Sequence, residues 1–313
     1  MSRSDKYSRR AFGLPLLSFF ALGAGCASEP EPHGPIDPAP AASWAAWPMP
    51  NSEGLGLPNE QSYEFVEGSA DAIVHDRVTG LDWQRTLDPA SFTWSAASLH
   101  CAALSYGGFS DWRVPTRIEL VSLLDLSRTD PAITLAAFPD TASEWYWTAS
   151  EDASDEARAW DVYFYFGYPD VAERVTENRV RCVRRAQPLA PALPHYEATP
   201  ELVRDSGTGL AWQRVAAAES FDAAAAREYC AGLVLGAESG FRVPTMKELQ
   251  TLVDDRHFEP AIDVEAFPDA PSESFWSSSA WSGTTELAWY VRFDSGGALY
   301  DVARESMRVR CVR

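Results

Sequence analysis

Apolar residues recur at helical spacing in two alanine-rich stretches of the chain. In the first stretch they lie at positions i, i+3, i+7 and i+10, namely Trp94, Ala97, Cys101 and Leu104. Residues at this spacing share one face of a helix. The stretch FDAAAAREYCAGL, which starts at Phe221, is rich in alanine at the matching place. The pattern predicts a helix in each stretch, with Cys101 and Cys230 on the buried faces.

A second, short helix is predicted after each of two RVPT motifs. Thr116 with Glu119, and Thr245 with Glu248, have the spacing of a capping box. In this motif the threonine hydroxyl and the glutamate carboxylate satisfy each other's free backbone N–H groups. Leucine and valine follow at the spacing of an inward face. A repeated glutamate could also serve catalysis, but capping is the simpler explanation.

Short runs rich in aromatic and β-branched residues predict antiparallel strands. The segments VHDRVTGLDWQR and VRDSGTGLAWQR each indicate a hairpin around a Thr-Gly turn. Further strands are expected at YWTAS and FWSSS, at AWDVYFYF and AWYVRFDS, and at two copies of RVRCVR. A long irregular section lies between the helices and these strands. The fold class expected is α+β, with the first and last elements of each domain on one sheet.

The chain contains a duplication. Two segments match at a constant offset of 129 residues without a gap. The matches include TGL at Thr79 and Thr208, WQR at Trp83 and Trp212, RVPT at Arg113 and Arg242, Trp147 with Trp276, and Trp160 with Trp289. A period this long indicates two complete domains rather than a solenoid. We call the copies repeat 1 and repeat 2, and we call residues 129 positions apart equivalent.

Each repeat holds two cysteines, which are 81 positions apart. In an exported protein this arrangement predicts one disulfide per domain, Cys101–Cys182 and Cys230–Cys311. Zinc binding is the competing interpretation, but two cysteines without a repeated histidine cannot complete a closed zinc site. Each bridge would tie the last strand of a domain to its first helix.

The first 26 residues are typical of a bacterial export signal. A basic stretch precedes an apolar run, Ala11 to Ala24, which is too short to span a bilayer. The expected organisation is an export signal over 1–26, a Pro/Ala-rich tether over 27–70, domain 1 over 71–185, a linker over 186–200 and domain 2 over 201–313.

Composition excludes global disorder and some ligand classes. The 313 residues are 46% hydrophobic and include 12 tryptophans, which is ample for packed cores. The first 26 residues hold four of the 26 basic and one of the 45 acidic residues, which leaves 22 basic against 44 acidic. A surface this acidic repels nucleic acid, anionic lipid and sulfated polysaccharide. It is compatible with neutral glycans, peptides, cations and basic partners.

Two motifs refine the export signal by resemblance. The run that starts at Ser8, SRRAF, resembles a twin-arginine signal, which exports folded proteins. LGAGC, which ends at Cys26, resembles a lipobox, in which the cysteine is lipidated. The resemblance implies a lipoprotein, and Ala27 after the cysteine fits the outer membrane. Cleavage by ordinary signal peptidase is the alternative, and either route takes the protein out of the cytoplasm.

Five motifs in constant order resemble the Lcl C-terminal domain family, which is named for a collagen-like bacterial surface adhesin. They are TGLxWQ, YC, RVPTxxEL, FWSSS and VRCVR, and both repeats carry the set with mild departures in repeat 1, at His100 and at Tyr146 to Ser150. The resemblance implies a C-type-lectin-like fold and an exported binding module. The name-giving adhesin binds sulfated glycosaminoglycans, but the acidity of this chain opposes such a polyanion.

Aromatic residues that occur in one repeat only are the candidates for ligand binding, because the repeated tryptophans are expected in the core. The candidates are Trp145, Tyr163, Tyr165 and Tyr168 in repeat 1, and Trp281, Tyr290, Arg292 and Tyr300 in repeat 2. Exposed rings suit stacking on sugar faces or docking to a partner. Ordinary packing is an equally good explanation for each ring taken singly. The repeated arginines are expected in ion pairs, with an anion-binding patch as the alternative.

Metal and catalytic sites are not expected. None of the five histidines has an equivalent histidine, which argues against a duplicated catalytic or metal site. Weak calcium candidates are Asp254, Asp255, Glu259, Asp263 and Asp269. An oxidase of formylglycine-generating type shares the lectin-like fold, but it uses a cysteine pair, and the domain cysteines are expected in structural bridges.

The function expected is an exported, lipid-anchored, non-catalytic surface protein that binds glycan or envelope polymer, with no cofactor and no nucleic acid. Two domains on a short linker would add avidity. The main alternative is a structural or protein-interaction module of the envelope, with a surface protein as partner. An enzyme is the third.

Overall fold

The computed structural model describes residues 44–66, 73–185, 195–268, 270–282 and 284–313. Both repeats belong to one compact unit of the chain. Among these residues no helix is long and apolar enough to cross a membrane. The export signal and Cys26 lie outside the described residues.

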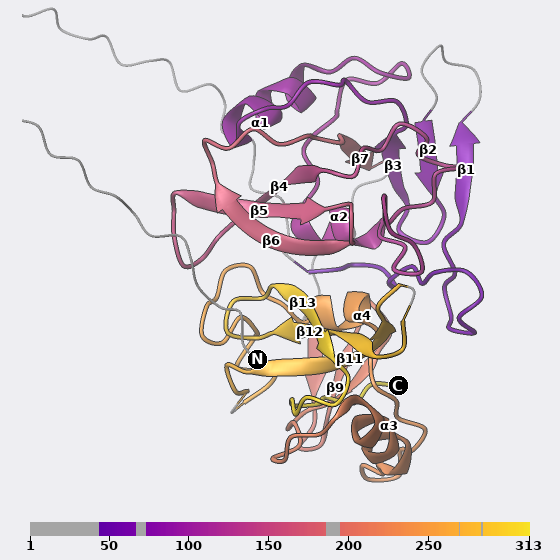
Figure 1. Cartoon of the computed structure of the whole chain (residues 1–313), viewed down its shortest axis with the longest axis vertical. Helices are drawn as coiled ribbons and strands as arrows, with labels where there is room; N and C mark the ends of the chain where they lie inside the picture. The colour runs from indigo at the N-terminus through magenta and orange to yellow at the C-terminus, as the bar shows by residue number, and fades with distance from the viewer. Residues whose placement is uncertain (1–43, 67–72, 186–194, 269, 283) are drawn as a thin grey trace, which may run out of the picture. The chain divides into compact units, whose positions relative to one another are not determined.

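Repeat 1 combines two helices with two small antiparallel sheets (Figure 1). Its elements are β2 (Ile73–Asp76), β3 (Leu81–Gln84), α1 (Trp94–Ala103), α2 (Arg117–Ser122), β4 (Trp145–Glu151), β5 (Arg158–Tyr163), β6 (Tyr168–Glu173) and β7 (Val183–Arg185). One sheet has the order β1-β2-β3-β7, where β1 is Tyr63–Val66, and the other has the order β4-β5-β6. The first and last strands of the repeat therefore share a sheet, as predicted.

Repeat 2 has the same plan. Its elements are β9 (Leu202–Asp205), β10 (Ala211–Gln213), α3 (Ala223–Gly232), α4 (Met246–Gln250), β11 (Ser274–Ala280), β12 (Leu287–Arg292) and β13 (Ala298–Val302). The sheets are β10-β9-β8, where β8 is Tyr196–Ala198, and β11-β12-β13. All strand pairs in the four sheets are antiparallel. The predicted mixture of few helices and antiparallel strands is confirmed.

Both short helices begin with the predicted capping box. The Thr116 side chain accepts from the Glu119 backbone N–H and the Glu119 carboxylate accepts from that of Thr116, and the same exchange joins Thr245 and Glu248. Each carboxylate also holds an arginine, Arg113 or Arg242, with a shortest N–O distance of 2.6 Å in both repeats. Both glutamates are buried. Both glutamates cap their helices, as predicted.

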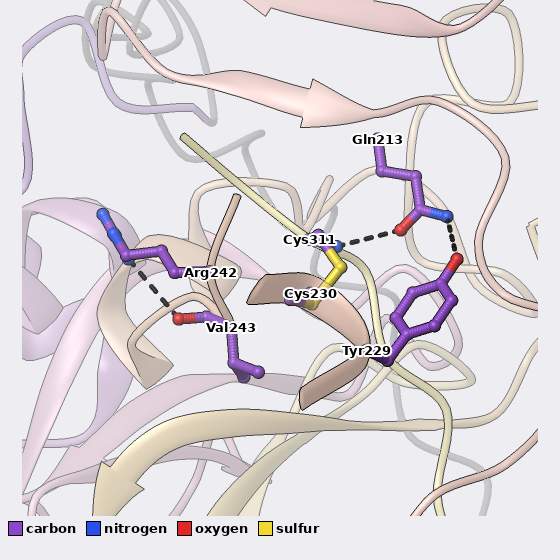
Figure 2. Close-up of a disulfide and its surroundings, with 6 residues drawn as sticks. All are labelled: Gln213, Tyr229, Cys230, Arg242, Val243 and Cys311. Carbon is purple, nitrogen blue, oxygen red and sulfur yellow. Dashed lines mark hydrogen bonds between the residues drawn. A yellow bond between two sulfur atoms is a disulfide. The ribbon is translucent and has the colours of Figure 1, made fainter. Parts of the chain in front are cut away.

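Both predicted disulfides are present, Cys101–Cys182 and Cys230–Cys311. Figure 2 shows the second bridge beside Gln213, whose side chain accepts from the Cys311 N–H and donates to the hydroxyl of Tyr229. Each bridge spans 81 residues. Closing a loop of this length stabilises the folded state by about 4–5 kcal/mol in the chain-entropy model.

Two segments expected outside the domains are partly built into them. The prediction of an extended tether is wrong for residues 44–66, because Trp47 and Met49 are buried in the main core and β1 pairs with β2. Strand β8 lies within the segment expected as a linker and pairs with β9. The apolar residues that lie among the prolines, such as Trp47, were the sequence indication that this segment packs against the domains.

The expected RVRCVR strands are shorter than predicted. In repeat 1 only Val183–Arg185 forms a strand, β7, which pairs with β3. In repeat 2 Val312 forms isolated bridges to Trp212 and Arg242. The preceding arginines, Arg181 and Arg310, turn inward and donate to carbonyls at the ends of the opening hairpins, Gln84 to Arg85 and Gln213 to Arg214. Both arginines are buried, and the backbone N–H groups of Gln84 and Gln213 still donate to the cysteine carbonyls.

The repeats contact each other through their short helices. Arg117, at the start of α2, donates to the carbonyl oxygens of Gln250 and Val253 at the end of α4. Lys247, in α4, donates to those of Ser122 and Leu124 at the end of α2, at 2.9 and 2.8 Å. Cations at the C-terminal carbonyls of a helix are favourable. Each short helix is therefore capped by a basic side chain from the other repeat, and burial lowers the pKa of Lys247 to about 7.

Candidate functional site

Three aromatic side chains lie side by side across the β4-β5-β6 sheet of repeat 1. Tyr163 is in register with Trp145 on one neighbouring strand and with Tyr168 on the other. The rings of Trp145 and Tyr163 are stacked, with centroids 4.5 Å apart and planes 14° apart, and Tyr168 meets Trp145 edge-on at 5.6 Å. All three are partly exposed. We call these three residues the aromatic row.

The aromatic row continues into repeat 2. Tyr165 stacks on Tyr163 at 5.9 Å, and Phe166 lies 4.5 Å from Tyr165. Phe166 also lies 4.8 Å from Trp281, whose ring is 3.6 Å from that of Tyr300. We call the row together with Tyr165, Phe166, Trp281 and Tyr300 the aromatic band. The band joins six of the eight predicted ligand residues.

A pair of carboxyl groups follows the aromatic row on the same sheet. Asp161 and Asp170 are opposite each other on β5 and β6, one row further along than Tyr163 and Tyr168. Asp161 is only 2% exposed. Its Oδ2 accepts from the Asn178 amide at 2.8 Å, and its Oδ1 has no partner among the described residues. Asp170 is exposed.

The pKa of Asp161 is raised to about 8, chiefly by burial and also by the charge of Asp170, against a lowering by the hydrogen bond from the Asn178 amide. Although Asp170 is exposed, the protein around its carboxyl partly desolvates it and raises its pKa. Burial raises the pKa of Tyr168 to about 12. At neutral pH the Asp161 carboxyl is therefore protonated. A neutral carboxyl can donate as well as accept a hydrogen bond. Beside aromatic rings, this pair suits ligands that carry hydroxyl groups.

Repeat 2 lacks both features. The residues equivalent to the aromatic row are Ser274, Arg292 and Gly297, and Tyr290 stands at the position of Asp161. Arg292 is held by Asp294 at 2.7 Å. Tyr290 contacts Trp276 edge-on at 6.1 Å. Among the ring contacts of the described residues, neither of these two predicted candidates joins the aromatic band.

The calcium candidates are engaged separately. Asp254 pairs with Arg256 and His257, and Asp255 pairs with the buried Arg117. Asp263 accepts from the backbone N–H groups of Glu265 and Ala266. Glu259 precedes a cis proline, and Asp269 lies outside the described residues. In the part of the chain that is described, no three His, Cys, Asp or Glu residues are grouped as a metal would need.

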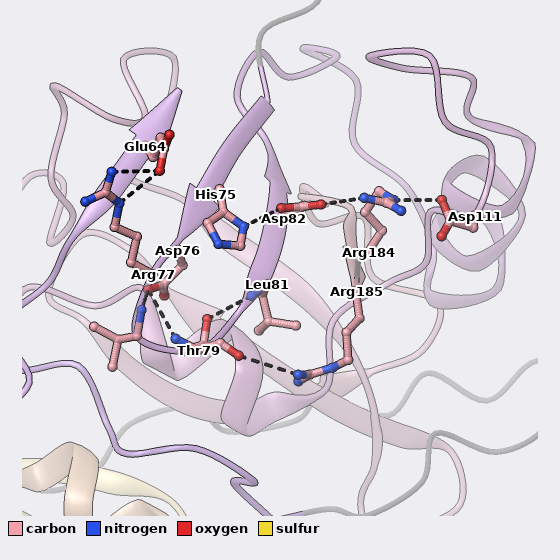
Figure 3. A network of polar contacts seen from close by, with 11 residues as sticks. Glu64, His75, Asp76, Arg77, Thr79, Leu81, Asp82, Asp111, Arg184 and Arg185 are labelled. Carbon is pink, nitrogen blue, oxygen red and sulfur yellow. Dashed lines mark hydrogen bonds and ion pairs between the residues drawn. The ribbon is translucent and has the colours of Figure 1, made fainter. Parts of the chain in front are cut away.

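The expected ion pairs form at only some of the repeated arginines, because Arg181 and Arg310 donate to backbone carbonyls instead. Besides the capping pairs, Arg179 binds Glu144 and Arg308 binds Glu273, as expected for ion pairs. Arg184 of repeat 1 lies between Asp82 and Asp111, and Asp82 also contacts His75 (Figure 3). The equivalent residues of repeat 2 differ, since Ala211 and Gly240 replace the two aspartates.

Two parts of the site were not anticipated from the sequence. Phe166, which bridges the repeats, follows candidate residues directly but was not singled out. Asp161 is an acid inside an apolar strand, AWDVYF, and its equivalent in repeat 2 is a tyrosine. An isolated acid in such a strand was the available signal.

A family model, rather than an individual protein, identifies the family of the chain. No curated protein matches it significantly. The family model described as the Lcl C-terminal domain matches residues 72–184 and again residues 201–313, which together make up most of the chain. The chain therefore belongs to the Lcl C-terminal domain family and carries this domain twice in tandem.

Proposed function

We propose that the protein is a non-catalytic surface-binding protein that takes a glycan or cell-envelope polymer along the aromatic band. The observation that carries this proposal is the stacked pair Trp145 and Tyr163 with Tyr168 beside it, partly exposed on one sheet. Flat, rigid rings bind the apolar faces of sugars at a small cost in conformational entropy.

The neighbouring carboxyl pair supports a hydroxyl-rich ligand. The exposed Asp170 offers acceptors next to the rings, and the buried, protonated Asp161 lies opposite it on the neighbouring strand. Hydrogen bonds from a charged group are stronger than those between neutral groups. A row of rings that continues over Phe166 to Trp281 would accommodate several units of a polymer rather than one.

We also propose that the protein is exported and lipid-anchored at Cys26. The two disulfides support an oxidising compartment. The segment before the first repeat has the order of a lipoprotein signal. The outer membrane or the extracellular face is the expected location, and the membrane is reached only through the lipid.

For the fold we propose the C-type-lectin-like class. In support, each repeat brings its first hairpin and its last segment together, with a disulfide from the first helix to that last segment. The small sheet that bears the aromatic row is the second one in the repeat. No calcium is needed for stacking, so binding should be indifferent to chelators.

The test is a glycan and cell-wall polymer array with the purified protein, followed by titration of the best ligand. The double variant Trp145→Ser, Tyr163→Arg installs the residues of repeat 2 at equivalent positions. Loss of the stacked pair should weaken binding at least roughly tenfold. The variant should stay folded, because both side chains are partly exposed.

Leu99→Ser is the matched control, since Leu99 is 73% exposed and is not part of the band. It removes exposed apolar surface and should leave binding unchanged, as should EDTA. An array without any ligand, together with a protein that co-purifies and is lost in the double variant, would replace this proposal by a protein-interaction module. Equal binding by the double variant and the wild type would remove the band from the site.

A further inference from the structure

A cavity of about 650 Å³ lies beside α4 and is separate from the aromatic row. Its walls come from the segment before repeat 1 (Leu55 and Leu57), from the loop after α2 (Leu126) and from repeat 2. Phe241, Val243 and Trp281 add apolar surface from repeat 2. Ligand sites of this size that are mostly apolar commonly take small molecules.

The charges of the cavity oppose those of the whole chain. Three basic residues line it, Arg227, Arg242 and Lys247, together with serine and threonine hydroxyls, but no carboxylate. Burial lowers the pKa of Lys247 to about 7, so the positive charge of the cavity comes mainly from the arginines. The chain as a whole has a net charge of −19. The next cavity, of about 520 Å³, is lined by Asp254, Asp263 and Glu265. Local positive charge within an acidic protein indicates an anionic group on the ligand.

Arg227 is the cation with free capacity. Both terminal nitrogens of Arg242 are bound by Glu248, at 2.7 and 2.6 Å. Lys247 donates to two backbone carbonyls. Arg227 is exposed on α3, and its guanidinium has no ion pair or hydrogen bond among the described residues. A guanidinium binds a carboxylate through two parallel hydrogen bonds.

Repeat 1 does not carry the basic residues of this cavity at two of the equivalent positions. Ser98 stands at the position of Arg227, and Ile118 at that of Lys247. The small residue Ala231, which also lines the cavity from α3, is equivalent to Ala102 of α1. The cavity chemistry is therefore particular to repeat 2, while its scaffold is shared.

We propose that this cavity binds a small amphipathic carboxylate, a molecule with one carboxylate on an apolar body. The carboxylate lies at Arg227 and the apolar body lies among Leu57, Phe241 and Val243. The cavity shares Trp281 with the aromatic band, but the proposal does not rest on glycan binding and would stand if the band bound no glycan.

The test uses the full chain and three probes with a chain of about ten carbons, of which the first is the carbonyl carbon in the acid and the amide. Decanoate, decanamide and decyltrimethylammonium are titrated by calorimetry at pH 7.5, below their micelle concentrations. We expect one saturable site for decanoate, with an affinity at least about tenfold higher than for the other two probes. Equal affinities for all three, or no binding of decanoate below about 1 mM, would overturn the proposal.

Two variants at arginines locate the carboxylate. Arg227→Gln should weaken decanoate about tenfold and leave decanamide unchanged, because it removes only the charged contact. Arg304→Gln, at an exposed arginine of the same repeat that does not line the cavity, should change neither. An effect of Arg304→Gln equal to that of Arg227→Gln would mean that the attraction is diffuse, and would overturn the proposal.

Ala231→Trp should fill the cavity and abolish decanoate binding. Its matched control is Ala102→Trp, at the equivalent, equally exposed position of repeat 1. Both variants are checked for unchanged thermal unfolding. Retained binding in Ala231→Trp, or equal loss in both variants, would place decanoate elsewhere and contradict the assignment.

Discussion

The two repeats share their framework and differ on their surface. Both keep the disulfide, the capping box with its arginine, and the inward arginine at 181 or 310. The repeats differ at the second sheet. Repeat 1 has Trp145, Tyr163 and Tyr168 there, and the equivalent residues of repeat 2 are Ser274, Arg292 and Gly297. At the cavity it is repeat 2 that carries the special residue, since Arg227 stands where repeat 1 has Ser98.

This difference separates what the fold requires from what each copy does. The residues kept in both repeats include those that serve packing, capping and the disulfide, and also a surface ion pair formed by Arg179 or Arg308. A residue found in one repeat only is either a surface feature or part of the contact between the repeats. Arg117 and Asp255 belong to that contact, because their equivalents are Met246 and Leu126. The comparison can be tested by exchanging residues between equivalent positions.

The largest effect is expected at the buried pair of Arg117 and Asp255. Both side chains are at most 5% exposed. Arg117→Met installs the residue of repeat 2 and leaves the Asp255 carboxylate buried without its partner. We expect the free energy of unfolding in urea to fall by about 3–5 kcal/mol.

The double variant Arg117→Met, Asp255→Leu installs both equivalents and removes the uncompensated charge. It should recover at least half of the loss. Met246→Leu, a change of shape alone at the equivalent site, should cost less than about 1.5 kcal/mol. A double variant no more stable than Arg117→Met would show that the pair is not what joins the repeats.

The next effect is the pH dependence caused by Asp161, which repeat 2 replaces with a tyrosine. Its pKa is raised from 3.8 to about 8 in the folded protein, mainly by burial. Between these values the unfolded chain binds fewer protons than the folded one, so this group makes stability fall as pH rises. Asp161→Asn removes the effect. As pH rises, the free energy of unfolding of the variant should increase relative to that of the wild type by up to about 1.4 kcal/mol per pH unit.

The measurement is urea unfolding followed by tryptophan fluorescence at pH 5, 6 and 7. Over this range the difference between Asp161→Asn and wild type should grow by about 2–3 kcal/mol. Asp155→Asn, at an exposed carboxylate of the same repeat, should run parallel to wild type. Parallel curves for both variants would mean that Asp161 is ionised in the folded protein.

The sequence predicted the framework well, because its signals are local or repeated. Helix α1 covers the predicted stretch, and Ala97 and Cys101 are buried as its spacing requires. The capping boxes and both disulfides followed from spacing and duplication. Strands β1 and β8 were missed, because their pairing partners lie in the repeats and their own segments are rich in proline.

The site was predictable in its residue types and less so in its arrangement. Six candidates converge through Phe166, but only the register of β4, β5 and β6 shows that Trp145, Tyr163 and Tyr168 form a row. The contact between the repeats could not be predicted. Buried cations such as Lys247 look like surface residues in a sequence, and their acceptors are backbone carbonyls of the other repeat.

The smallest effect concerns an ion pair that both repeats keep at the surface. Arg179 binds Glu144 at 2.7 Å and Arg308 binds Glu273 at 2.9 Å, and both glutamates are about half exposed, at 52% and 49%. The arginines lower the pKa of both carboxyls through hydrogen bonds. Because water and salt screen such pairs, Glu144→Gln and Glu273→Gln should each cost less than about 1 kcal/mol in urea unfolding, and less still at high salt. A larger loss of stability for one of the two variants would show that equivalent ion pairs contribute unequally to stability. Identity between the repeats would then no longer be enough to assign a residue to the shared framework.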